Sequence, residues 1–299
     1  MTTLLSMTRR NIKLFFHDKG LFFTSLITPL ILLVLYVSFL GNVYKDSIMA
    51  FFPEGITVSE RIVDSVAVGQ LISSILSVSC VTVAFCSNML MVQDKVTGAA
   101  LDIAVTPVKR AYLSLSYYIA TYVSTSIICI TATLVCLAYA NAMNSYIGFR
   151  EAVLLLSDVL ILAMLGTAVS SIINFFLSSQ GQISAVGSMV SSTYGFVSGA
   201  YMPISQFSPV LQKIISLLPG TYGTSLMRNH AIASTLDVME AEGIPTEIVE
   251  AIRDGFDLNI YFFGNRVGVG GMYAVLLLTV LLLIVIYVVI NCTCKKVRK

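Results

Sequence analysis

The stretch MVQDKVTGAALDIAVTPVKR, Met91–Arg110, is a polar segment in an otherwise apolar chain. Its charged residues are Asp94, Lys95, Asp102, Lys109 and Arg110. Gly98 favours a break in a helix and Pro107 favours an end, so Asp94 to Thr106 is predicted to form a short amphipathic helix between two bends. Apolar segments long enough to cross a bilayer lie on both sides. The stretch is either a functional loop at a membrane surface or an ordinary charged loop between two spans.

The composition excludes a soluble protein. Hydrophobic residues make up 57% of the 299 residues and charged residues only 11%, whereas ordinary globular domains are about 25% charged. The mean hydropathy is +0.87. Cys292 and Cys294 are two thiols in a basic tail, and a structural metal site needs about four ligands, so we expect no metal site.

The pattern predicts an all-α polytopic membrane protein with one transmembrane domain, 1–299. A membrane-spanning helix needs about 20 apolar residues. Six segments meet this requirement, near 21–41, 66–91, 112–140, 151–177, 183–203 and 267–291. We therefore expect six transmembrane helices, with Pro29 kinking the first.

Residues 4–19 are basic and amphipathic. At helical spacing one side of this segment carries Ser6, Arg9, Arg10, Lys13 and His17, and aromatic residues lie on another. Such a helix is expected to lie in the membrane interface, with its basic side toward headgroups or a partner.

The segment after the fifth span, 204–266, is broken by Pro209, Pro219 and glycines. Irregular backbone at membrane depth is tolerated only when it is buried in protein, so we expect a re-entrant hairpin or short interfacial helices first. The acidic part, 234–257, carries the start and stop signals of two small solvent-exposed helices, with breaks at Gly243 and Gly255.

The charge distribution predicts the orientation. Basic residues exceed acidic ones in the N-terminal segment, in the loop 92–110 and in the tail, whereas 42–65 and 205–266 are acidic. The positive-inside rule then places both termini and the loop 92–110 in the cytoplasm of a cell-membrane protein.

The order of these parts resembles the membrane subunit of an ABC exporter of the ABC-2 type, over nearly the whole chain. The loop KVTGAALDIAVTPVKR is similar to the family pattern E-x-G-T-L-x-x-L-x-x-[TS]-P-x-x-R, matched at Gly98, Leu101, Pro107 and Arg110. Thr28-Pro29 in the first span and the run SGAYMPISQFSPVLQKIISLLPGTYGTSLMR add to the resemblance.

The resemblance implies two six-span subunits, alike or paralogous, above two ATPase subunits. This chain has no phosphate-binding G-x-x-x-x-G-K-[ST] loop, so ATP and Mg would be held by the partner and this chain would not be an enzyme. The residues implied to couple to the ATPase are Arg9, Arg10, Lys13, Asp94, Lys95, Val96, Gly98, Leu101, Asp102, Val105, Pro107 and Arg110.

The resemblance also places the second and fifth spans across a dimer axis. The pathway residues then implied are Ser73, Ser77, Thr82, Met189, Ser192, Tyr194 and Phe196, although the same side chains would serve helix packing equally well. Aromatic, Met and hydroxyl side chains suit an amphipathic or lipid-like substrate, such as a drug, antibiotic peptide, lipid or glycan. Pro209, Pro219 and Tyr222 would belong to the outer re-entrant segment.

Alternatives remain open. An ion-coupled secondary transporter needs intramembrane carboxylates, and Asp158 is the single acidic residue well inside an apolar segment, with no basic partner in a span. Asp158 is expected to hydrogen-bond to a neighbouring span. A membrane enzyme needs clustered acids or histidines, but His17 and His230 are predicted on opposite sides. A non-transporting sensor on the same scaffold is the third alternative.

Overall fold

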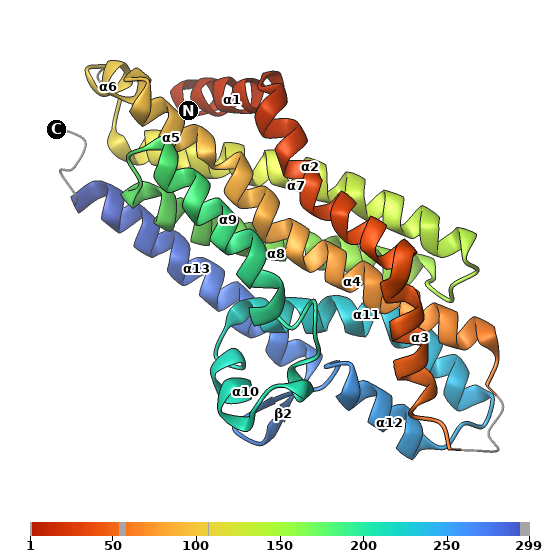
Figure 1. The fold of residues 1–299 in the computed structure, drawn as a ribbon. Helices are drawn as coiled ribbons and strands as arrows, with labels where there is room; N and C mark the ends of the chain where they lie inside the picture. Colours follow the sequence, from red (N-terminus) through yellow and green to blue (C-terminus); the bar gives the residue numbers. More distant parts are fainter. Residues whose placement is uncertain (1, 54–57, 107, 294–299) are drawn as a thin grey trace.

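The computed structural model describes residues 2–53, 58–106 and 108–293, and these residues are mostly helical (Figure 1). The N-terminal half contains α1 (Thr2–His17), α2 (Lys19–Leu35), the π-helical turn η1 (Tyr36–Leu40), α3 (Gly41–Met49), α4 (Glu60–Ser87), α5 (Met89–Val96) and α6 (Ala99–Ala104). The long helices α7 (Arg110–Ala142) and α8 (Phe149–Phe176) follow.

The C-terminal half begins with α9 (Gln180–Val197), the short turn η2 (Ile204–Gln206) and α10 (Pro209–Ile215). It continues with α11 (Pro219–Ala241), α12 (Thr246–Gly255), the strands β1 (Ile260–Phe262) and β2 (Asn265–Val267), and α13 (Val269–Thr293). The two strands pair in an antiparallel hairpin with Tyr261 opposite Arg266.

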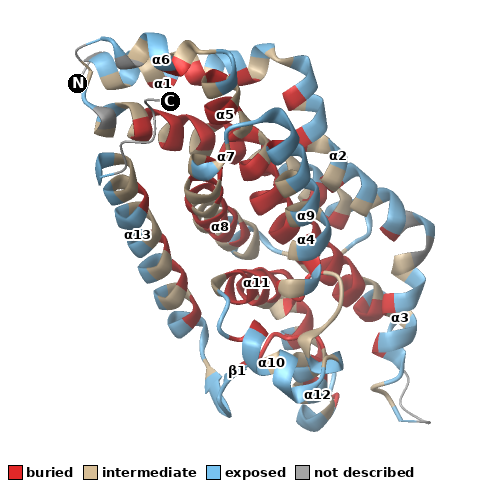
Figure 2. Cartoon of the chain, turned by 60° about the vertical axis from the view of Figure 1, so that its left-hand side comes forward, coloured by how far each residue is buried: buried red, intermediate tan, exposed pale blue. Residues whose placement is uncertain are grey.

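Helix α4 is the centre of the bundle, and α2, α7, α8 and α11 pack around it. Its side chains are almost all buried, as Figure 2 shows. Small residues allow the close approach that membrane helices favour. A Cβ on Gly69 would lie 2.9 Å from the carbonyl oxygen of Ala231 in α11, and one on Gly166 would lie 2.9 Å from that of Cys80.

The two ends of the bundle differ. In both views α1, α5 and α6 lie together at one end, and α10, α12 and the hairpin lie at the other (Figures 1 and 2). Four helices of the described residues are long and apolar enough to cross a membrane: 60–96, 111–142, 149–176 and 269–293. The pair α1 and α2, bent by 72°, would be a fifth. The count of six spans therefore stays a prediction.

The helical structure differs from the expectation in two segments. Helical structure continues past the predicted first span to Met49, because Tyr44 and Ile48 are buried where α3 packs against α4. The segment around Ser234 does not start a separate exposed helix, since Thr235, Leu236 and Met239 are buried on one continuous α11. Only α12 of the two small external helices forms as expected.

Candidate coupling surface and membrane groove

The polar stretch that follows α4 folds as two helices rather than one. Asp94, Lys95 and Val96 belong to α5, which continues the direction of α4 after a short break at Asn88. Gly98 adopts φ +84° and is the N-cap of α6, a left-handed conformation that glycine accepts without steric cost. The predicted helix from Asp94 to Thr106 is therefore divided at Gly98, and its separate part has only six residues.

A buried carboxylate fixes α5 to two other helices. Asp94 is 5% exposed and accepts hydrogen bonds from both terminal nitrogens of Arg10 in α1, at 2.7 and 3.2 Å. The Tyr117 hydroxyl of α7 donates to the same carboxylate at 2.5 Å. This two-pronged contact is the strong form of an arginine–carboxylate pair, and the hydrogen bond to Asp94 raises the pKa of Arg10.

Lys95 fixes the same helix to α8. Its ammonium group donates to the carbonyl oxygens of Asn174, Phe175 and Leu177, at 3.0, 2.7 and 3.1 Å. The last carbonyls of a helix have no partner within it, and a cation there satisfies them. Asp94, Lys95 and Arg10 thus make contacts inside the molecule.

The apolar residues of the stretch point outward instead. Val96 is 49% exposed, Leu101 53% and Val105 87%. Asp102 is also exposed, and α6 packs mainly on α5. Arg9 and Lys13 lie exposed on α1. Pro107 and the side chain of Arg110 lie outside the described residues. Of the twelve residues, Arg10, Asp94 and Lys95 form an internal brace. Val96, Leu101 and Val105 form an exposed apolar surface, which we call the α6 surface.

The predicted pathway residues do not form one surface. Ser77 is fully buried and pairs with Thr224 of α11, so it links two helices. Ser73 is also fully buried, and its hydroxyl donates to the Gln70 carbonyl oxygen within α4. Met189 and Tyr194 line a hollow of about 400 Å³ on another side of α9.

The remaining three residues, Thr82, Ser192 and Phe196, line a groove of about 950 Å³ between α2, α4, α5 and α9. Hydroxyl groups and aliphatic side chains alternate along it, and none of its lining residues carries a charge. We call this space the α2–α9 groove. Its hydroxyl-bearing residues are Thr24, Thr28, Thr82, Ser184, Ser188, Ser191, Ser192 and Tyr201.

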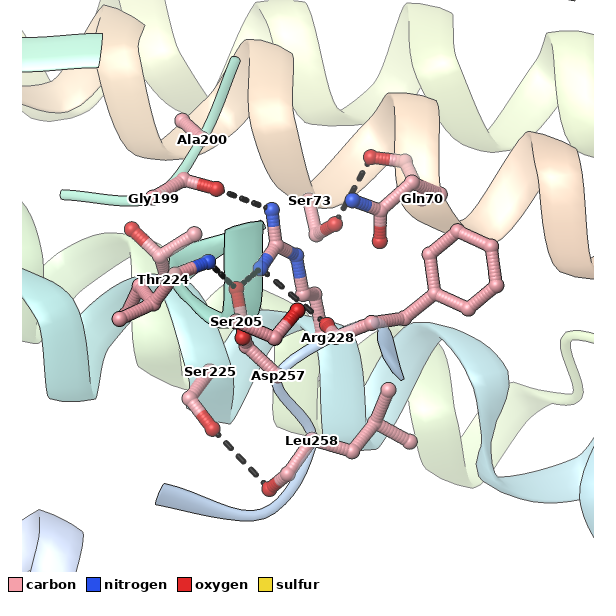
Figure 3. Close-up of polar contacts among 12 residues, drawn as sticks. Gln70, Ser73, Gly199, Ala200, Ser205, Thr224, Ser225, Arg228, Asp257 and Leu258 are labelled. Carbon is pink, nitrogen blue, oxygen red and sulfur yellow. Dashed lines mark hydrogen bonds and ion pairs between the residues drawn. The ribbon is translucent and has the colours of Figure 1, made fainter. Parts of the chain in front are cut away.

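A buried arginine that sequence reasoning missed joins three segments of the chain (Figure 3). Arg228 of α11 is 1% exposed and donates to Asp257 at 3.0 Å and to the Phe256 carbonyl oxygen at 3.2 Å. It also bonds the Gly199 carbonyl oxygen, and Asp257 accepts from the backbone NH of Ile204 at 2.6 Å. One guanidinium thus links the end of α9, α11 and the segment after α12.

The predicted outer residues lie beside this linkage. Pro209 and Pro219 stand at the starts of α10 and α11, where a missing NH costs nothing. The Tyr222 hydroxyl donates to the Ser216 carbonyl oxygen at 2.7 Å and closes the turn between the two helices.

Asp158 has partners on two elements. The Tyr273 hydroxyl of α13 donates to Oδ1 at 2.5 Å, so a hydrogen bond to a neighbouring span is present as expected. His230 of α11 lies 2.6 Å from Oδ2 through Nδ1. The expectation that no basic partner lies in a predicted span is not contradicted, because His230, 72 residues away, lies on α11, which was not predicted as a span. The contact itself was not predicted, since α11 was not expected to pack on α8.

A family model described as ABC-2 type transporter matches residues 2–230. Comparison with curated proteins and with solved structures found no match. The matched region runs from the start of α1 into α11, and so includes the brace, the α6 surface and the α2–α9 groove. With more than half of its length matched, the chain belongs to the ABC-2 type transporter family.

Proposed function

We propose that the chain is the transmembrane subunit of an ATP-driven ABC exporter and that the α6 surface docks a separate ATPase chain. The observation that carries this proposal is an exposed apolar surface on a braced polar segment. Leu101 and Val105 are four residues apart and share a helix face, and apolar residues grouped on an exposed face favour contact with a partner.

The brace supports a role in force transmission. A push on α6 reaches α5, and α5 is joined to α1 and α7 through Asp94 and to α8 through Lys95. Helix α5 also follows α4 directly at Asn88. A movement of α6 would therefore displace the central helix of the bundle rather than being absorbed by a flexible loop.

The surface of α9 supports pairing with a second permease subunit. Only Ile183 and Gly195 of this helix are buried, and its exposed residues are mostly serine, threonine, glycine and glutamine. By contrast, the exposed face of α13 consists of Leu, Val and Ile. A lipid-facing helix is apolar outward, whereas small and hydroxyl-bearing residues favour contact between helices.

The α2–α9 groove supports an uncharged amphipathic cargo. It offers hydroxyl groups for polar parts and Leu, Ile and Phe side chains for apolar parts, without a charged group that would hold an ion. A drug, an antibiotic peptide, a lipid or a glycan are the classes that we propose, with the cytoplasmic side at α6 and the outer side at α10 and α12.

The test is co-purification of the permease with its ATPase chain. Leu101→Asp is expected to abolish association and ATP-driven transport, because it places a charge in an apolar contact. Asp102→Asn, in the same helix, is the control and is expected to do much less, since an exposed charge is worth under about 1 kcal/mol. Unchanged association of Leu101→Asp would show that this loop is an ordinary connection.

A secondary transporter is the second candidate, and the buried group of Asp158, His230 and Tyr273 is the observation that favours it. Carboxylates and histidines in a membrane mark proton pathways in some transporters. Transport by vesicles that follows a proton gradient without ATP would support this function and contradict the first.

A further inference from the structure

A second groove lies on the opposite side of α2 from α9. It has a volume of about 430 Å³ and is bounded by α2, α4 and α7, with the bend between α1 and α2 at one end. Its lining is almost purely apolar: Phe16, Phe22, Leu26, Pro29, Leu30, Leu33, Ile75, Ile127, Ile128, Thr131, Ala132, Val135 and Cys136. The hydroxyl of Thr131 is already bonded to the Ile127 carbonyl oxygen at 2.8 Å.

The groove exists because α2 and α7 both pack on α4 but pack little on each other. Ile75 of α4 forms its floor and is 2% exposed. Small side chains on the walls, such as Ala132 and Pro29, leave the space unfilled. The residues at the rims are aliphatic and exposed, as expected of a surface that faces lipid tails. For example, the exposed fraction of Leu30 is 56%.

One end of the groove is basic. Phe16 and Phe22 close that end, with ring centroids 6.0 Å apart. Lys13 lies three residues before Phe16, and Lys19 lies three residues before Phe22. Residues at this spacing share a helix face, so Lys13 lies on the face of α1 that carries Phe16, and Lys19 on the face of α2 that carries Phe22. Both lysines are exposed, and neither has an ion-pair partner among the described residues.

We propose that this groove binds one acyl chain of an anionic phospholipid from the leaflet next to α1. The chain lies between α2 and α7 on Ile75, and the phosphate lies near Lys13 and Lys19. The uncharged walls accept a hydrocarbon chain, and the paired lysines select a negative headgroup over a zwitterionic one. This binding site goes beyond the proposed exporter function and does not depend on it.

The absence of tryptophan from the sequence makes a direct test possible. Leu30→Trp places a single fluorophore on the rim of the groove, and Leu281→Trp places one on the exposed face of α13 as the control. Each protein is reconstituted in bilayers that contain either brominated phosphatidylglycerol or brominated phosphatidylcholine at equal mole fraction, and quenching of the fluorophore is measured.

The proposal predicts that Leu30→Trp is quenched preferentially by the anionic lipid. A lysine near a membrane surface contributes about 1 kcal/mol to the binding free energy of an anionic lipid. Each of the two lysines should therefore raise the association constant of the anionic lipid roughly fivefold. Combining Leu30→Trp with Lys13→Gln and Lys19→Gln should remove the preference, while Lys213→Gln, at the other end of the bundle, should leave it. Leu281→Trp should show no preference.

Two results would overturn the proposal. Equal quenching of Leu30→Trp by the two lipids would mean that the groove is ordinary lipid-facing surface. Weak quenching by both lipids would mean that another protein surface, such as a second copy, covers the groove.

Discussion

Replacing Asp94 by asparagine tests whether the internal ion pair braces the α6 surface. Asparagine keeps the size of the side chain but removes the charge that accepts two hydrogen bonds from Arg10 and one from Tyr117. A hydrogen bond to a charged group contributes roughly 1.5–3 kcal/mol. The Arg10 side chain is 36% exposed, so solvent screens part of its attraction to Asp94. We therefore expect Asp94→Asn to lower the free energy of local opening of this region by about 2 kcal/mol.

Hydrogen exchange measures this loss locally. The amides of α5 and α6 exchange through local opening, whose free energy should fall by the same amount. About 2 kcal/mol corresponds to roughly 30-fold faster exchange in Asp94→Asn. Asp102→Asn is the matched control, because that carboxylate is exposed and forms no ion pair within the described residues. Unchanged exchange of α5 in Asp94→Asn would refute the brace.

The complementary change, Arg10→Gln, should have a larger effect than Asp94→Asn. It leaves a buried carboxylate with only the Tyr117 hydroxyl as a side-chain partner, and an unpaired buried charge costs more than a lost pair. The stability lost by the double variant should therefore be less than the sum of the stability losses of the two single variants. Additive losses would show that the two side chains do not interact energetically.

Three further results are expected. Asp158→Asn should keep the melting temperature and most transport, because its amide can still hydrogen-bond to Tyr273 and His230, whereas Asp158→Leu should lower the melting temperature by leaving both unpaired. Complete loss of transport in well-folded Asp158→Asn would contradict this. Gly98→Val should reduce ATPase co-purification without changing the melting temperature of the membrane part. A β-branched residue at φ +84° costs roughly 1–2 kcal/mol, which should distort the start of α6. A normal yield of the complex with Gly98→Val would contradict this prediction. Glu242→Cys, in a background without native cysteines, should react with an impermeant thiol reagent added outside intact cells. A lack of reaction would contradict the predicted orientation of the chain in the membrane.

The sequence predicted the elements whose signals are local, such as the apolar run of α13, because helix length and hydropathy act within one segment. Gly98 was recognised as a possible helix breaker, and Pro209 and Pro219 as interruptions, but the division of 94–106 at Gly98 and the long helix α11 were not predicted. The β-hairpin was missed, although the aromatic residues before Phe263-Gly264 and the turn there are a recognisable signal.

The internal contacts could not be predicted in the same way. Arg10 and Asp94 are 84 residues apart, and Arg228 and Asp257 come from elements whose packing depends on the course of α11. A single sequence shows which residues carry charge but not which of them meet. For this reason the exposed and the buried members of the polar stretch looked alike, and the difference emerged only from the fold.

The central claim, that an ATPase chain docks on α6, is tested most directly by protection of Val105. This residue is 87% exposed, so Val105→Cys, in a background without native cysteines, should react rapidly in inside-out vesicles stripped of the ATPase. Rebinding the ATPase chain should suppress the reaction, whereas Glu242→Cys, which would face the vesicle lumen, should not react with an impermeant reagent with or without the ATPase. Rapid labelling of Val105→Cys in the assembled complex, or labelling from outside intact cells, would contradict the account.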